Sequence, residues 1–262
     1  MHNTTMKDWK SIRIKFQTAA WLPAPYSYFY TLDLTPEGKN LGVALTLHYL
    51  DRDEIDEDMI LEEGFSLDDD YSWQGTLSAV WHNQLSRALE KLEKAQSDDV
   101  AEHENYLVVE VQSQAGKPAD FTPTDRPYWD YFQQELIQAI YEASGKEHAF
   151  ALEYLEIEAS NKLRIQIDAS FAERSFSVRL DGNAPQLLDW KWTKDVMETV
   201  FKADFLPHEA PDEVPRFSGR YLITGDGVWY EFNETLVEPT PKSKVLPQIV
   251  RLMDTLREQA IR

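Results

Sequence analysis

Polar and apolar residues alternate through the middle of the chain with the period of two that is typical of a β-strand. In residues 162–169, Ile165 and Ile167 would face one side of the strand, and their charged and polar neighbours would face the other. The same alternation in residues 150–159 and 176–180 predicts a strand on either side of this one. Short polar segments separate the three strands, so we expect an antiparallel meander.

A helical period replaces this alternation toward the C-terminus. Apolar residues share one face of a predicted helix over residues 193–201, with Thr193 as its N-cap. Gly225 and Gly227 lie between two aromatic-rich runs and predict a hairpin in residues 220–232, because glycine tolerates the positive φ of tight turns. The chain then closes in an amphipathic helix, whose apolar positions are Leu246, Ile249, Val250, Met253 and Leu256.

The first half of the chain shows the same two periods. They predict two strands, a long helix, a further strand and a second helix, over residues 26–34, 43–49, 77–92, 107–111 and 127–143 in that order. Asp125 is a suitable N-cap for the last of these helices, since Pro127 is favoured in a first helical turn.

The two halves therefore present similar elements in a similar order, once an acidic segment, residues 51–70, is treated as an insertion. Anchor residues also recur at nearly fixed spacing: Tyr30 with Tyr154, Trp73 with Trp190, Tyr106 with Tyr221, and Leu136 with Leu252. We predict an α+β fold of two similar halves, each an antiparallel β-meander packed by helices, produced by tandem duplication. The halves would comprise residues 1–124 and 125–262, joined near residues 112–126 or within the helix that follows. A chance likeness between two strand-and-helix modules is the alternative explanation.

Acidic residues outnumber basic ones in this chain of 262 residues. Asp and Glu total 46 against 26 Lys and Arg, which gives a net charge of −20, so a nucleic acid duplex or an anionic membrane would be repelled. We expect neither as a partner. Residues 51–70 contain 11 of the acids and have Arg52 as their only base, so the excess is strongly local.

The class of protein is narrowed by three features that the sequence lacks: cysteine, a secretory signal and a membrane-spanning segment. The chain has no cysteine, which excludes disulfides and thiolate chemistry and favours the cytosol. Residues 1–17 are charged and lack an apolar run, so we expect no secretory signal. No segment has the roughly 20 apolar residues needed to cross a bilayer. We therefore predict a cytoplasmic protein.

The acidic segment does not fit a calcium-binding loop. Aligned with an EF-hand, residues 51–62 place Ile55 at a ligand position and Asp56 where the sharp turn needs glycine. The six histidines lack metal-ligand spacing, and the sequence contains no nucleophile elbow, phosphate-binding glycine loop or dinucleotide fingerprint. We therefore predict no catalytic residue, no metal site and no cofactor.

Three interpretations of the acidic segment remain open. It is a solvated surface that keeps the chain from associating, an irregular carboxylate cluster that chelates a cation, or a docking site for a basic partner. In the last case, the carboxylates would steer and orient the partner more than they would add affinity. The candidate partner-binding residues are Asp51, Asp53, Glu54, Asp56, Glu57 and Asp58.

Aromatic residues gather in residues 21–30 and 126–132. Such runs can form a stacking platform for a sugar or an extended peptide. However, Tyr26, Tyr28 and Tyr30 share their strand face with leucines, which favours packing in a core.

In its order of elements, the second half resembles the type III secretion chaperone-like fold: a helix, three strands, a helix, two strands and a helix. The resemblance covers residues 125–262 and rests on this order, so no binding residue is carried over. Members of that family include small acidic proteins that hold extended segments of their partners without catalysis. The first half departs from the family, because its acidic insertion has no counterpart there.

We therefore expect a non-catalytic protein-interaction module, chaperone-like or adaptor-like, that binds an extended or basic partner. The alternatives are a carboxylate-based hydrolase with a cleft between the halves, and a glycan- or ligand-binding protein that uses the aromatic runs. A pocket with convergent polar groups would favour the hydrolase. An exposed row of coplanar rings would favour the glycan-binding protein, and an apolar patch or an unpaired strand edge would favour the module.

Overall fold

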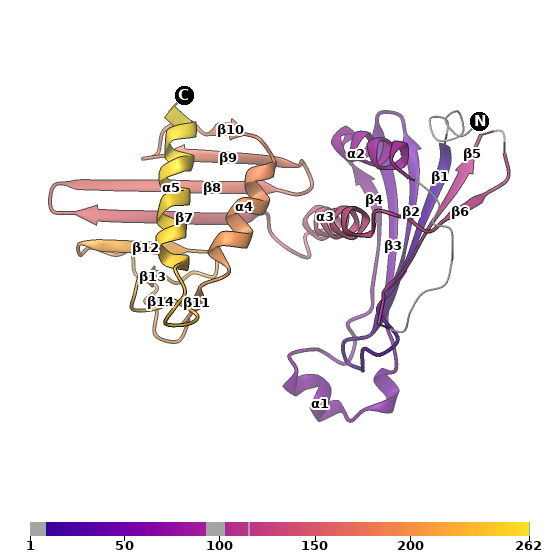
Figure 1. The fold of residues 1–262 in the computed structure, drawn as a ribbon, viewed down its shortest axis with the longest axis horizontal. Coiled ribbons are helices and arrows are strands. Elements are labelled where there is room, and N and C mark those ends of the chain that lie inside the picture. Colours follow the sequence, from indigo (N-terminus) through magenta and orange to yellow (C-terminus); the bar gives the residue numbers. More distant parts are fainter. Residues whose placement is uncertain (1–8, 93–102, 115, 262) are drawn as a thin grey trace. The chain divides into compact units, whose positions relative to one another are not determined.

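The computed structural model describes residues 9–92, 103–114 and 116–261, and it combines α-helices with antiparallel β-sheets (Figure 1). The chain divides into two compact units, Met1–Lys146 and Glu147–Arg262. Each unit contains a six-stranded sheet. The predicted α+β class is confirmed.

In the first unit, a meander of four strands is extended by two further strands beside its first one. From edge to edge the strands are β4 (Tyr71–Leu77), β3 (Asn40–Tyr49), β2 (Tyr28–Glu37), β1 (Trp9–Gln17), β5 (Tyr106–Ser113) and β6 (Ala119–Phe121), and every neighbouring pair is antiparallel. Between β3 and β4 the acidic insertion forms a short 3-10 helix, η1 (Arg52–Glu54), and helix α1 (Glu57–Glu62). The insertion therefore interrupts a hairpin of the meander.

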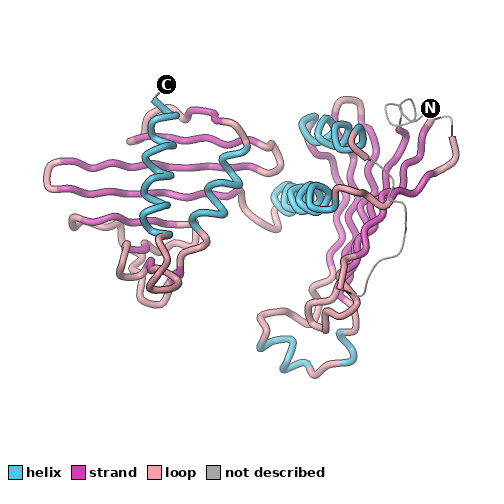
Figure 2. The backbone as a smooth tube through the Cα atoms, in the orientation of Figure 1, coloured by secondary structure: helices cyan, strands magenta, loops and turns pink. Residues whose placement is uncertain are grey.

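Two helices, α2 (Ala79–Glu90) and α3 (Arg126–Ser144), cover one face of this sheet (Figure 2). Side chains that alternate along the strands reach this face, and Leu32 at its centre is fully buried. Asp125 caps α3 as predicted, since its carboxylate accepts a hydrogen bond from the Tyr128 N–H at 3.2 Å.

The second unit repeats this plan. Its sheet consists of β10 (Gln186–Leu188), β9 (Ser175–Leu180), β8 (Asn161–Ser170), β7 (Phe150–Glu158), β12 (Gly219–Ile223) and β13 (Tyr230–Glu231), all antiparallel to their neighbours. Helices α4 (Lys191–Val200) and α5 (Val245–Ile261) cross one face of the sheet (Figure 2). The predicted three-strand meander and the hairpin with Gly225 and Gly227 are both confirmed.

The two units match element by element. Strands β1 to β4, helix α2, strands β5 and β6, and helix α3 correspond in order to strands β7 to β10, helix α4, strands β12 and β13, and helix α5. The sheet orders correspond as well, because β5 adds beside β1 and β12 adds beside β7. The second unit has one addition, a small sheet of β11 (Asp204–Phe205) and β14 (Leu236–Val237). The prediction of two similar halves is confirmed, and this shared order is what a tandem duplication predicts.

The prediction omits β1, and this omission shifts part of the predicted correspondence. The signal for β1 is the alternation of Ile12, Ile14 and Phe16 with basic and polar residues. Two anchor pairs fall on matched elements: Tyr106 with Tyr221 on β5 and β12, and Leu136 with Leu252 on α3 and α5. The other two pairs do not: Tyr30 on β2 with Tyr154 on β7, and Trp73 on β4 with Trp190 just before α4.

The boundary between the units also differs from the predicted one, which lies between residues 124 and 125. The compact units divide after Lys146, because α3 packs in the first unit. The hydroxyl of Tyr71 on β4 donates a hydrogen bond to the Ser144 hydroxyl at the end of α3, at 2.7 Å. The rings of Trp81 on α2 and Phe132 on α3 lie 6.2 Å apart. The opening helix that the chaperone resemblance assigns to the second half is therefore a helix of the first unit.

Thr193 is not the N-cap that the sequence predicts. Helix α4 begins at Lys191, and Thr193 is buried inside its first turn. The Asp189 carboxylate accepts the Lys191 N–H at 2.9 Å, so an acidic residue upstream satisfies the start of this helix.

Candidate functional site

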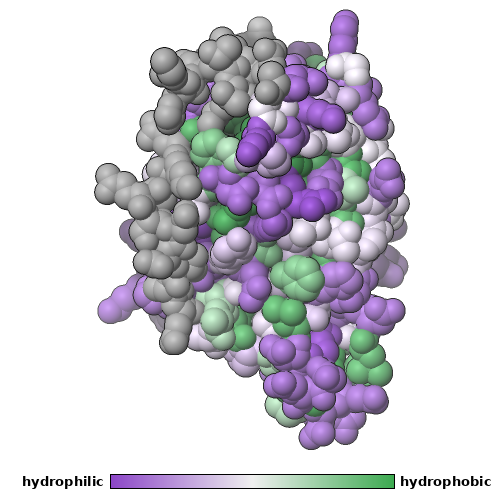
Figure 3. Space-filling model, turned by 90° about the vertical axis from the view of Figure 1, so that its right-hand side faces the viewer, coloured by the Kyte–Doolittle hydropathy of each residue, from purple (hydrophilic) through white to green (hydrophobic). Residues whose placement is uncertain are grey.

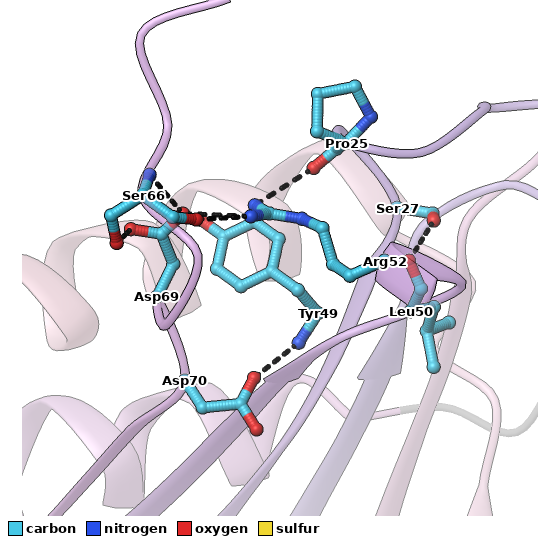
Figure 4. Close-up of polar contacts among 8 residues, drawn as sticks. All are labelled: Pro25, Ser27, Tyr49, Leu50, Arg52, Ser66, Asp69 and Asp70. Carbon is cyan, nitrogen blue, oxygen red and sulfur yellow. Dashed lines mark hydrogen bonds and ion pairs between the residues drawn. The ribbon is translucent and has the colours of Figure 1, made fainter. Parts of the chain in front are cut away.

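The acidic insertion is folded around its only base, Arg52 (Figure 4). The guanidinium donates hydrogen bonds to the carbonyl oxygens of Ser66, at 2.7 Å, and Pro25, at 3.2 Å. It also forms an ion pair with Asp69 at 3.0 Å. These contacts join the two ends of the insertion to the loop between β1 and β2, so one side chain fixes three segments of the chain.

Arg52 also lies against two aromatic rings. Its guanidinium carbon is 4.3 Å from the ring centroid of Tyr49 and 4.9 Å from that of Phe65. The Arg52 side chain is only 13% exposed. The one positive charge of the insertion is thus used internally, and it does not neutralise the carboxylates on the outer surface.

Two carboxylates, those of Asp69 and Asp70, fix the end of the insertion where the chain enters β4. Asp69 accepts hydrogen bonds from the N–H and the hydroxyl of Ser66, at 3.0 and 2.6 Å. Asp70 lies 2.6 Å from His48 Nδ1 and accepts the N–H of Tyr49 at 2.8 Å. The residues before β4 are therefore tied to the end of β3.

These contacts lower the pKa of both carboxyl groups. Burial by itself would raise the pKa of Asp69, but hydrogen bonds from Ser66 and Arg52 outweigh burial and hold that pKa below its ordinary value. The hydrogen bond with His48, with a smaller contribution from the Tyr49 N–H, lowers the pKa of Asp70. Both groups favour the folded insertion in their charged form.

The insertion is therefore expected to loosen in acid. A carboxyl group whose pKa is lowered by folding stabilises the fold above its unfolded pKa of about 3.9, and this stability is lost as the pH falls through the folded pKa. In an NMR titration, the Ser66 amide resonance should shift with a midpoint below the ordinary Asp value of 3.8. The Asp69→Asn variant should lose this transition. A midpoint at or above 3.8 in the unmodified protein would contradict the prediction.

The six predicted partner-binding residues, Asp51, Asp53, Glu54, Asp56, Glu57 and Asp58, are all exposed. None of them forms an ion pair with another residue in the described part of the chain. Three large apolar side chains of the insertion are exposed as well: Met59 at 53%, Leu61 at 54% and Leu67 at 54%. Ile60 is the buried residue of α1. The nine exposed residues form what we call the acidic-apolar surface, seen as mixed purple and green side chains at the lower end of Figure 3.

A metal site receives no support from this geometry. Among the residues that the structure describes, no group of three or more His, Asp or Glu side chains is arranged to hold a metal ion. The carboxylates of the acidic-apolar surface are exposed along η1, α1 and the residues that cap them, whereas a calcium site needs several oxygens that converge on one point.

The aromatic runs contribute mainly to packing. Tyr30 is 3% exposed, and its ring stacks on that of Phe16 at a centroid distance of 4.9 Å. Trp129 and Phe132 of the second run lie on α3 and are buried. Trp21 is 64% exposed, but no row of exposed parallel rings accompanies it in the described part of these runs.

An open groove with a volume of about 1070 Å³ lies within the second unit, between the sheet and the start of α5. Its polar residues include Glu156 and Arg220, which form an ion pair at 2.7 Å. The groove has no local signal in the sequence, because these two residues are far apart in the chain and meet only through the pairing of β7 with β12. Burial raises the pKa of the Asp130 carboxyl group, but this group lies on α3 and outside the groove.

Comparisons of the chain with models of protein families, with curated proteins and with solved structures find no match. The resemblance to the type III secretion chaperone-like fold therefore stays a prediction. No helix in the described residues has both the length and the apolar character needed to cross a bilayer.

Proposed function

We propose that this chain is a cytosolic, non-catalytic protein-interaction module that docks a basic, amphipathic segment of its partner on the acidic-apolar surface. The observation that carries the proposal is the folding of the insertion. Arg52 is used internally, while six carboxylates and three apolar side chains stay exposed on the same appendage.

The chemistry of this surface matches that of such a partner. Exposed carboxylates attract a basic segment over about 8–10 Å at physiological salt and orient it before contact. Met59, Leu61 and Leu67 then provide apolar area, which contributes about 25 cal/mol for each Å² removed from water. Methionine is well suited to such a surface, because its flexible side chain adapts to different partners.

A fixed appendage also lowers the cost of binding. Ordering a flexible loop on binding costs free energy for each residue that is immobilised. The contacts of Arg52, Asp69 and Asp70 order the insertion in the free protein, so a partner would meet carboxylates that are already in place.

Neutralising four carboxylates should separate this proposal from a purely solvating role. The variant D51N/D53N/D56N/D58N should bind a synthetic helical peptide with one leucine face and one lysine face about tenfold more weakly, a loss of about 1.4 kcal/mol over four rim charges. Fluorescence anisotropy with the full chain measures this change. Stability should stay within about 0.5 kcal/mol for each substitution, because all four side chains are exposed.

The matched control removes the same charge elsewhere. In D212N/E213Q/E234Q/E258Q, four exposed acids of the second unit are neutralised, and peptide affinity should change less than twofold. Equal weakening in both variants would mean that the peptide responds to net charge, and the proposed docking surface would be wrong. A Leu61→Ser variant should also weaken binding while keeping its salt dependence, since it removes apolar contact alone.

A further inference from the structure

The groove in the second unit lies on the face of the sheet that carries the helices. It is lined by the ends of β7 and β12, by β13 and the turn after it, and by the first turns of α5. Strands β7 and β8 extend past α5 on this side (Figure 1), so part of this sheet face has no helix over it.

An ion pair occupies the floor of the groove. Glu156 on β7 is the cross-strand partner of Arg220 on β12, and the Arg220 Nε donates to the Glu156 carboxylate at 2.7 Å. Tyr154 lies two residues before Glu156 on the same face, and its side chain is buried. Glu156, Arg220 and the Tyr154 hydroxyl thus place charged and polar groups on the sheet face that elsewhere carries the apolar core of the second unit.

The first unit has an apolar pair at the matching place. Strand β5 begins at Tyr106 and β12 begins at Gly219, and the next pair inward is Leu107 with Phe16 in the first unit and Arg220 with Glu156 in the second. Leu107 and Phe16 are both buried, at 0% and 7% exposure. The first unit closes this part of its sheet with its own side chains, whereas the second unit leaves it open and charged.

The two long sides of the groove carry opposite charges. Glu158 lines the side formed by the sheet, and Lys244 and Arg251 line the side formed by α5. Apolar side chains lie between these two sides: Phe232, Leu246, Pro247 and Val250. The groove is therefore an apolar channel with one acidic and one basic rim.

The start of α5 is not an anion site. Both carboxylate oxygens of Glu238 accept hydrogen bonds from the first amides of this helix, those of Val245 at 2.7 Å and Leu246 at 3.1 Å. These amides are the usual means by which a helix terminus binds an anion, and here they are already satisfied. A small anionic ligand is therefore disfavoured as the occupant.

From this arrangement we infer that the groove docks an amphipathic helix of a protein partner, with its apolar face on the channel, a basic flank along Glu158, and an acidic flank along Lys244 and Arg251. A helix is about 10–12 Å wide with its side chains, so about two turns fill the volume. It would lie beside α5 as a third helix over this sheet. The site shares no residue with the acidic-apolar surface, and the inference goes beyond the function proposed for that surface.

The test uses the full chain with D51N/D53N/D56N/D58N already in place, so that binding at the insertion is weakened. Three helical peptides of about 18 residues are compared, each with a leucine face and with flanks of Lys and Lys, Glu and Glu, or Lys and Glu. The peptide with one Lys flank and one Glu flank should bind at least tenfold more tightly than either of the others. Val250→Trp, which fills the channel from a partly buried position on α5, should remove this binding.

Two control variants distinguish a blocked groove from a general effect of the substitutions on the fold. Val214→Trp places the same ring at an exposed position of the second unit outside the groove, and it should leave binding unchanged. Glu158→Lys makes both rims basic and should shift the preference to the peptide with two Glu flanks, an effect that a general loss of structure would not produce.

Three outcomes would overturn the inference. One is equal binding by the Val250→Trp and Val214→Trp variants, and another is no preference among the three peptides. The third is self-association of the unmodified chain that Val250→Trp abolishes in sedimentation velocity, which would assign the groove to a second copy. None of these outcomes bears on the peptide binding proposed for the acidic-apolar surface, which is measured without these changes.

Discussion

Replacing Arg52 with Ala is expected to unfold the acidic insertion while both six-stranded sheets stay intact. The substitution removes two hydrogen bonds to carbonyl oxygens, the ion pair with Asp69 and two ring contacts, all from a side chain that is 13% exposed. Hydrogen bonds to charged groups contribute about 1.5–3 kcal/mol each, so a local loss of about 2–4 kcal/mol is expected. Limited proteolysis should then cleave rapidly within residues 51–70.

Arg52→Lys is the informative control for this prediction. Lysine keeps the charge, but its single ammonium group lacks the planar fork that reaches Ser66, Pro25 and Asp69 while lying on two rings. Its cleavage rate should fall between those of the Ala variant and the unmodified chain. If the Ala variant resists the protease as well as the unmodified chain does, Arg52 does not hold the insertion. The proposed docking surface would then lose its ordering argument.

Leu136→Ala in helix α3 is expected to destabilise the first unit by about 2–5 kcal/mol, the usual cost of such a truncation in a packed core. Leu136 is fully buried in the first unit. Hydrogen exchange followed by mass spectrometry should show lost protection in β1 to β5 and unchanged protection in β7 to β9. The result tests directly the assignment of α3 to the first unit.

Leu256→Ala on α5 is the matched control, because Leu256 is equally buried and α5 corresponds to α3 in the second unit. It should produce the reverse pattern, with protection lost in the second sheet and kept in the first. Loss of protection in both sheets from either substitution would mean that the two units unfold together. The boundary at Lys146 would then not separate two cooperative folding units.

Periodicity predicted most of the fold, because the long central strands of these sheets have one face in a core. The strands around Ile165 were located to within a residue or two, and the Asp125 cap was placed correctly. The boundary was misplaced for a physical reason: the amphipathic pattern of α3 shows that the helix is covered on one face, but not which sheet covers it. The choice of sheet depends on packing partners such as Tyr71 and Trp81.

The candidate sites were less accessible to sequence analysis. The excess of acids in residues 51–70 was evident, but the role of Arg52 depends on contacts with Pro25 and Tyr49 that only the folded chain brings together. No sequence pattern near Glu156 or Arg220 indicated the groove. Glu156 alternates with leucine and isoleucine along β7 like any exposed strand residue, and its pairing with Arg220 follows from sheet order.

The edges of the two sheets bear on how any partner can be held. At three of the four edges of the two six-stranded sheets, the outermost strand has only two or three residues: β6, β10 and β13. Such short strands offer few free main-chain groups for an incoming strand, which also protects a β-rich chain from fibril formation. Selectivity in this protein would then reside in side chains, and it could change by point substitution while the backbone template stayed the same.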